Sequence, residues 1–284
     1  MQPMKPKSHF VELEGLKSHY VQMGTGNTTV LLIHGDMRTS RSFDALSRKL
    51  ASTHTVTAMD LFGHGNSDWP FSGYRFVERS YNIENFMTTV FDGHADAVVA
   101  HSTGGIALAL YAARKPSAFN FIVLLEPMIT VDEKFQRMVS SRETRPRTTW
   151  SNKEELTQVL SKHEVTKKWT SEVIKDVVEH ETFINEDGRL DMKWATQTLS
   201  WKDRDGDYFD LLPTLQKLEV PTLFMASEDR QSIFQPVKEL SRIKNNIHFC
   251  TVMNTGHNMY MERPQAAATL IKTLQSGQPI PEEI

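Results

Sequence analysis

This chain of 284 residues has little of several things that would mark particular classes of protein. Its single cysteine, Cys250, excludes an internal disulfide and favours a reducing compartment. Its longest apolar runs, Thr29 to Ile33 and Phe121 to Leu125, are far too short to span a bilayer. The N-terminal segment has no apolar stretch of the kind found in a signal peptide. We therefore expect a cytoplasmic globular protein.

The chain also lacks a large excess of charge of either sign and the common motifs for metal and phosphate binding. The 32 basic and 35 acidic residues nearly balance, so nothing favours nucleic acid or an anionic membrane as a partner. No histidine and carboxylate group has the spacing of a metal site, and no Gly-Lys-Ser/Thr follows the glycines at Gly63 and Gly65. We expect no metal and no cofactor, with a small molecule as the partner. The oligomeric state stays open.

What is present is an alternation of short β-like and helix-like runs. Two candidate strands, around Phe10 to Leu13 and Ser18 to Met23, predict a leading hairpin at a sheet edge. Continuous apolar strands separated by helical segments predict a mostly parallel, doubly wound α/β sheet. The strands are expected at residues 29–33, 55–59, 97–100, 121–125, 222–226 and 247–252.

The pattern changes after Met128. Residues 129–212 are rich in charged residues and helix formers, without a convincing buried strand, which predicts a helical insertion after the sixth strand. We expect a core domain formed by residues 1–128 and 213–284. The insertion also holds many aromatic residues, of which most should form its own core and two or three should face a pocket: Phe135, Trp150, Trp169, Trp194, Trp201, Tyr208 and Phe209.

The most informative motif surrounds Ser102. This serine stands between the small residues Ala100 and Gly104, after a β-branched run and before a helix-like run. A side chain at such a tight strand-to-helix turn projects clear of the sheet. A serine there needs a base to take its proton before it can act as a nucleophile.

Polar motifs also follow the other predicted strands. They are His34-Gly35-Asp36-Met37, the segment from Asp60 to Ser67, Ser227-Glu228-Asp229 and Thr255-Gly256-His257. The carboxyl ends of parallel strands form the ligand-binding edge of open α/β sheets. With these motifs in this order, the chain resembles the α/β-hydrolase fold superfamily over nearly all of its length outside the insertion.

The resemblance implies a catalytic triad in the order nucleophile, acid, histidine, carried here by Ser102, Asp229 and His257. Glu126, at the end of the preceding strand, is the alternative acid, since some relatives draw the acid from that position. The resemblance also implies an oxyanion hole formed by the backbone N–H groups of Asp36 and Thr103. The insertion would then lie over the strand ends as a lid.

Several neighbouring residues receive a less direct role. We expect His34 and His64 to hydrogen-bond loop backbone, and His101 to support the site. The Asp36 side chain is expected either to bond the following loop at Arg38, Thr39 or Ser40, or to line the pocket and contact substrate. An apolar pocket is expected to include Phe62, His101, Met128 and Met259.

These expectations favour a serine hydrolase that cleaves a small or medium hydrophobic ester or lactone through an acyl-enzyme. Amide, thioester and C–C bond cleavage are open, because the same triad performs them within the superfamily. A cofactor-free dioxygenase or a perhydrolase is an alternative on the same scaffold. So is a slow-turnover ligand receptor, because fold alone does not define function.

Overall fold

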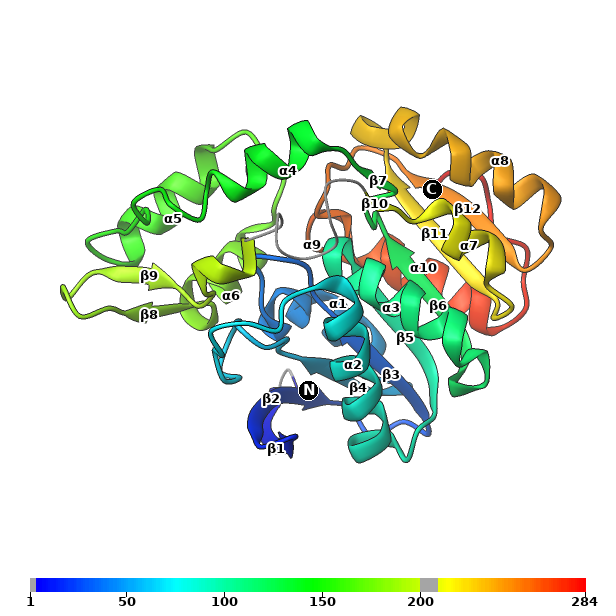
Figure 1. Cartoon of the computed structure of the whole chain (residues 1–284), viewed down its shortest axis with the longest axis horizontal. Helices are drawn as coiled ribbons and strands as arrows, with labels where there is room; N and C mark the ends of the chain where they lie inside the picture. Colours follow the sequence, from blue (N-terminus) through cyan, green and yellow to red (C-terminus); the bar gives the residue numbers. More distant parts are fainter. Residues whose placement is uncertain (1–3, 200–208) are drawn as a thin grey trace.

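The computed structural model describes residues 4–199 and 209–284, and its centre is one eight-stranded sheet (Figure 1). The strand order is β1-β2-β4-β3-β5-β6-β11-β12. The strands are β1 Lys7–Leu13, β2 Leu16–Met23, β3 Thr28–Ile33, β4 His54–Met59, β5 Ala95–His101, β6 Phe119–Leu125, β11 Thr222–Ser227 and β12 Ile247–Val252. Strands β4 to β12 pair in parallel, while β2 pairs antiparallel with both β1 and β4. The predicted mostly parallel sheet and its leading edge hairpin are confirmed.

The central strands are buried because they are apolar on both faces. In β3, the four residues from Val30 to Ile33 have no exposed surface. Strands β5 and β6 show the same nearly continuous burial. Such strands need helices on both sides of the sheet, since water can solvate neither face.

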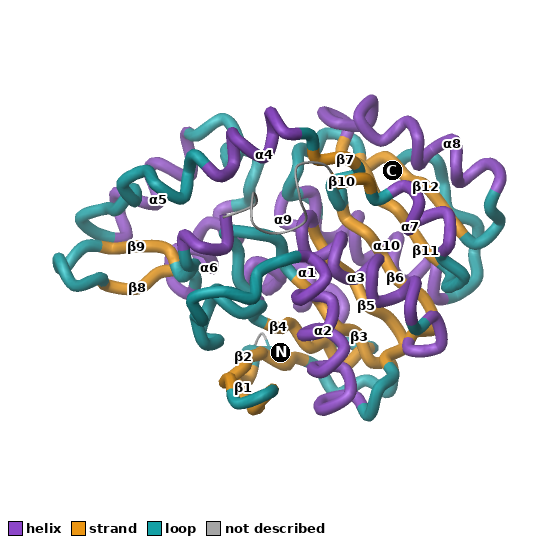
Figure 2. The backbone as a smooth tube through the Cα atoms, viewed as in Figure 1, coloured by secondary structure: helices purple, strands orange, loops and turns teal. Residues whose placement is uncertain are grey.

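Helices cover the two faces of the sheet and form two separate apolar clusters (Figure 2). Those flanking the sheet are α1 Asp44–Leu50, α2 Phe76–Phe91, α3 Ser102–Arg114, α7 Leu212–Lys217, α8 Gln235–Ile243, α9 Met259–Glu262 and α10 Pro264–Gln275. Helices α2, α3, α7 and α8 contribute to one cluster, and α1, α9 and α10 to the other. No described helix is long and apolar enough to cross a membrane.

Residues 129–212, which we call the insert, enter the chain between β6 and β11. Its helices are α4 Glu133–Ser140, α5 Lys153–Lys162 and α6 Ser171–His180, and α5, β8 and β9 extend away from the sheet in Figure 1. The insert, expected to be helical without a convincing buried strand, also contains short strands. Two short antiparallel pairs join β7 Thr130–Val131 to β10 Phe209–Asp210 and β8 Thr182–Ile184 to β9 Leu190–Met192. At two or three residues each, these strands are too short to show a period-2 pattern.

The insert packs against the sheet domain through α6. Its buried residues Val173, Ile174 and Val177 belong to the same apolar cluster as helix α1. Arg48 of α1 reaches across to two carboxylates of α6, Glu172 at 2.9 Å and Asp176. The aromatic residues Trp201 and Tyr208 lie outside the described residues.

Candidate active site

Ser102 lies at the turn where β5 ends and α3 begins, as predicted. Its φ of +51° is in the left-handed region, which costs a non-glycine residue about 1–2 kcal/mol. The side chain is half-buried, whereas His101 and Thr103 on either side are buried. The strained turn therefore leaves the serine partly open to solvent between two covered neighbours.

Two glycines allow the backbone to close around this turn. A Cβ on Gly104 would lie 2.3 Å from the carbonyl oxygen of His34, and a Cβ on Gly35 would lie 2.8 Å from Cβ of Ser102. Both separations are too short for any larger residue. The loop after β3 consequently lies directly against Ser102.

His257 joins this group from the loop after β12. Its Nδ1–H donates to Oε2 of Glu126 at 2.7 Å, and its ring centroid lies 4.5 Å from that of His101. His101 Nε2–H in turn donates to the backbone carbonyl of His257 at 2.9 Å. His101 thus links the histidine loop to the turn that carries Ser102.

Glu126 is the carboxylate that the structure brings to His257. It follows β6, has no exposed side-chain surface and accepts a second hydrogen bond from the backbone N–H of Ser227 at 2.7 Å. Arg230 Nε lies 3.1 Å from its Oε2. Burial would raise the pKa of Glu126, but the hydrogen bonds from His257 and Ser227 outweigh it and lower the pKa.

The expectation that Asp229 holds His257 is not met by this geometry. The Asp229 carboxylate accepts from Lys168 Nζ at 2.7 Å, and more than half of its side-chain surface is exposed. Its neighbour Glu228 accepts from the backbone N–H of Asn254 at 2.7 Å. Both residues follow β11, but they point toward solvent and the loop backbone.

The loop expected to form the oxyanion hole is tied to α3 and α2. The N–H of Asp36 donates to Oγ1 of Thr103 at 3.0 Å. The Asp36 carboxylate pairs with the buried Arg79 of α2 at 2.8 Å, and Arg79 Nη1 also lies 3.4 Å from Thr103 Oγ1. Arg79 was not among the loop residues that were expected to bond the Asp36 side chain. Its positive charge offsets the negative charge of the Asp36 carboxylate near Ser102.

His34 and His64 hydrogen-bond loop backbone, as expected. His34 Nδ1–H donates to the carbonyl of Gly35 at 2.7 Å, and its Nε2 accepts from the N–H of Leu61 at 3.0 Å. His64 accepts from the N–H of Met37 at 3.3 Å. Burial lowers the pKa of His34 to about 4 and that of His64 well below its usual value, so both rings are neutral near pH 7.

The residues expected to line an apolar pocket are largely covered. Met259 is fully buried in the cluster on the α1 face, Phe62 is 9% exposed, and Met128 packs partly buried against the opposite cluster. A cavity between the insert and the loop after β3 is lined by Trp150 and Trp194, which belong to the group of seven aromatic residues from which two or three were expected to face a pocket.

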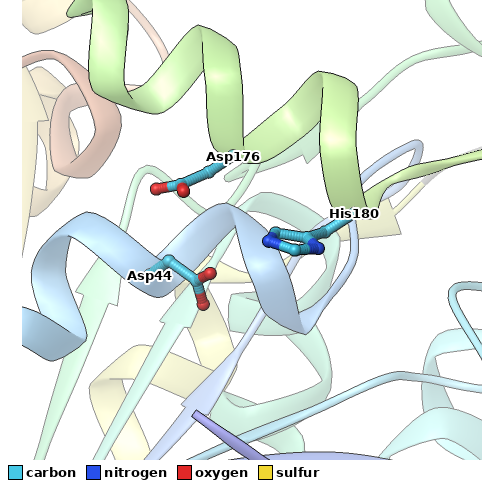
Figure 3. A group of neighbouring side chains, drawn as sticks. All are labelled: Asp44, Asp176 and His180. Atoms are coloured by element: carbon cyan, nitrogen blue, oxygen red, sulfur yellow. The ribbon is translucent and has the colours of Figure 1, made fainter. Parts of the chain in front are cut away.

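A second group of polar side chains lies where α6 meets α1 (Figure 3). Asp44, Asp176 and His180 place ligand-type atoms within 4.8 Å of one another. Arg41 already makes hydrogen bonds of 2.6 to 3.1 Å to Asp44, and Arg48 pairs with Asp176. Guanidinium partners on both carboxylates oppose a cation there, so this group joins the insert to the sheet domain.

Sequence reasoning missed Arg79, Arg230 and Lys168. Arg79 had a signal, because it falls on the apolar face of α2 at helical spacing from Phe76 and Ile83. A charged residue at such a position needs a buried partner. Arg230 and Lys168 stand in polar segments, where a pattern of residue types does not indicate a contact.

The sheet topology and the strand-end site define the α/β-hydrolase fold. The pattern of the Alpha/beta hydrolase family matches residues 30–270, so this chain belongs to that family. Cis-3-alkyl-4-alkyloxetan-2-one decarboxylase of Shewanella oneidensis is 32% identical over 122 residues, covering 42% of this chain and 38% of that protein. 2-(Acetamidomethylene)succinate hydrolase of Mesorhizobium japonicum is 29% identical over 119 residues, covering 42% of each.

The solved structures show the same fold over nearly the whole chain. A crystal structure of E-2-(acetamidomethylene)succinate hydrolase has a TM-score of 0.81 at 19% identity, covering 96% of this chain and 100% of the other. In contrast, matched stretches span only 35% to 38% of the length of curated relatives such as the Shewanella decarboxylase. Their activities therefore do not transfer to this chain as a whole.

Proposed function

We propose that this chain is a serine hydrolase whose triad is Ser102, His257 and Glu126. One observation carries the proposal: the 2.7 Å hydrogen bond from His257 Nδ1 to the fully buried Glu126, with the His257 ring 4.5 Å from that of His101, which directly precedes Ser102 at its strained turn. This bond holds the imidazole with Nε2 as the base for Ser102. A buried carboxylate also stabilises the imidazolium that forms during the reaction.

The reaction begins when Ser102 Oγ attacks the acyl carbon and its proton passes to His257. His257 then gives that proton to the leaving oxygen, and the acyl group stays on Ser102 as an ester. Water attacks this ester with His257 as the base, which releases the acid and restores the serine. No redox step or co-reactant besides water is needed.

The negative charge that develops on the acyl oxygen requires N–H donors. The N–H of Thr103, in the first turn of α3, has no carbonyl of its own helix to bond. The N–H of Asp36 donates to Thr103 Oγ1 in this structure, so rotation of the Thr103 side chain would free it for the oxyanion. Each such donor is worth about 3 kcal/mol of barrier.

We favour a hydrophobic ester or lactone as substrate. The Shewanella relative's name describes an oxetan-2-one, which is a cyclic ester, and the Mesorhizobium relative is named as a hydrolase. The first relative is named as a decarboxylase and the second as a hydrolase, so the two names describe different reactions. The apolar side chains around the insert cavity, including Trp150, Trp194 and Met192, support a substrate with a hydrophobic part.

The test is hydrolysis of short-chain and medium-chain aryl esters and lactones, with labelling by a fluorophosphonate probe. Ser102→Ala should lower turnover on the order of 10⁶-fold and abolish labelling. Ser276→Ala, which removes an exposed serine after α10, is the matched control and should leave both unchanged. Full activity in Ser102→Ala, or labelling at another serine, contradicts the proposal.

A further inference from the structure

A cavity of about 240 Å³ lies between the insert and the loop that follows β3. Its wall combines Met37 of that loop with the insert segment that contains Arg142, Arg145 and Arg147. Among its lining residues, these three arginines face a single carboxylate, that of Asp191. Counted over the lining residues that the structure describes, the cavity has an excess of two positive charges.

Arg147 and Asp191 neutralise each other and build the wall. Arg147 Nε and Nη2 bond the Asp191 carboxylate at distances from 2.5 to 3.0 Å. The same guanidinium donates to the backbone carbonyls of Met192 and Trp194, at 2.7 and 2.8 Å, and stacks on the Trp194 ring. With its donors used in this way, Arg147 has a structural role.

Arg142 and Arg145 differ because neither has a carboxylate partner among the described residues. Both side chains are exposed to solvent, and Arg145 donates from Nη2 to the hydroxyl of Ser141 at 3.2 Å. Two guanidinium groups in the lining of one cavity suit a carboxylate or a phosphate, which guanidinium groups bind through paired hydrogen bonds.

The cavity shares Met37 with the loop that lies against Ser102. Met37 directly follows Asp36, and its N–H donates to His64. His64 forms a backbone bridge with Trp194, which lines the same cavity. A group bound between the arginines would therefore lie on the insert side of the loop expected to hold the oxyanion.

We propose that this cavity binds an anionic end of the substrate, a carboxylate or a phosphate, with Arg142 and Arg145 as its partners. The inference rests on the proposed function and deepens it. The substrate class becomes an ester whose apolar chain ends in an anion. Trp194 and Met37 contact the chain, and the arginines contact the charge.

The experiment compares p-nitrophenyl hexanoate with its analogues that carry a terminal carboxylate or a terminal phosphate on the acyl chain. In Arg142→Gln/Arg145→Gln, kcat/KM for an anionic ester should fall about 10- to 100-fold through KM, whereas that for the hexanoate should change less than about 3-fold. The analogue that loses more distinguishes phosphate from carboxylate. The matched control is Arg137→Gln, which removes the same charge from α4 outside the cavity lining and should behave like the parent.

Equal losses for neutral and anionic esters, or no loss for either, would overturn the inference. A separate titration keeps it distinct from the proposed function. Hexyl phosphate and adipate are titrated into the Ser102→Ala protein, with tryptophan fluorescence as the readout, with and without the two arginine substitutions. Binding that needs both arginines, in a parent that hydrolyses no ester, would support the cavity and refute the hydrolase. Ester hydrolysis without arginine-dependent binding would do the reverse.

Discussion

The two carboxylates that follow the neighbouring strands β6 and β11 have opposite surroundings. Glu126 is fully buried and accepts hydrogen bonds from His257 and Ser227. Asp229 has more than half of its side chain exposed and pairs with Lys168. Water screens the charge of an exposed carboxylate, whereas a buried one interacts strongly with its partners. The difference shows that burial and direction, more than position at a strand end, determine which acid can support a histidine.

The largest effect should come from removing the charge of Glu126 while keeping its shape. Glu126→Gln should lower kcat by about 10⁴-fold, because an amide can hold His257 in the unproductive tautomer and cannot stabilise the imidazolium. Steady-state kinetics on an aryl ester measures this, with circular dichroism to show that the variant is folded. A loss of kcat below about 10-fold would contradict the conclusion that Glu126, and not Asp229, supports His257.

A third carboxylate, Glu181, extends the comparison. It is fully buried like Glu126, but its charged partner, Arg38 Nη1, lies at 3.4 Å, and neither oxygen has a hydrogen-bond partner among the described residues. Burial raises its pKa to about 7, against the attraction of Arg38. The pKa values of these two buried carboxylates therefore shift in opposite directions, since Glu126 accepts hydrogen bonds and Glu181 accepts none among the described residues.

The raised pKa of Glu181 predicts a pH-dependent stability. Between its ordinary pKa near 4.5 and about 7, the unfolded chain loses this proton while the folded protein keeps it. The free energy of unfolding should therefore fall as pH rises through this window, by about 3 kcal/mol, and level off above it. Urea denaturation at pH 5 and at pH 8 measures how much the free energy of unfolding changes between these pH values. Glu181→Gln should remove the contribution of Glu181 from that change.

Glu179→Gln is the control for this experiment, since Glu179 lies two residues before Glu181, in the last turn of α6, and pairs with Lys153 at the surface. It should keep the pH dependence of the parent. An unchanged pH dependence in Glu181→Gln would show that Glu181 ionises in the folded protein much as it does in the unfolded chain.

The smallest effect is expected from Asp229→Asn. Loss of an exposed ion pair to Lys168 costs between 0 and about 1 kcal/mol, so turnover should stay within about 3-fold of the parent. The same aryl ester assay measures it beside Lys168→Met, which breaks the pair from the other side. A loss of several orders of magnitude in Asp229→Asn alone would return the triad position to Asp229.

The sheet was predictable because its strands are continuous apolar runs, and the place of Ser102 was predictable because small residues flank it. Which of the two carboxylates bonds His257 was not predictable. Strands β6 and β11 are adjacent in the sheet, so both carboxylates end at the same edge, and only side-chain direction separates them. The short strands of the insert and the Asp36–Arg79 pair depend on tertiary contacts that residue patterns do not show.

The hydrogen bond between His257 and Glu126 can be observed directly by proton NMR. A short bond from a histidine Nδ1–H to a carboxylate gives a resonance far downfield of the amide protons. We predict this signal in the parent and in Asp229→Asn, and its loss in Glu126→Gln and in His257→Gln. A signal that persists in Glu126→Gln and disappears in Asp229→Asn would contradict the assignment of Glu126 to the triad.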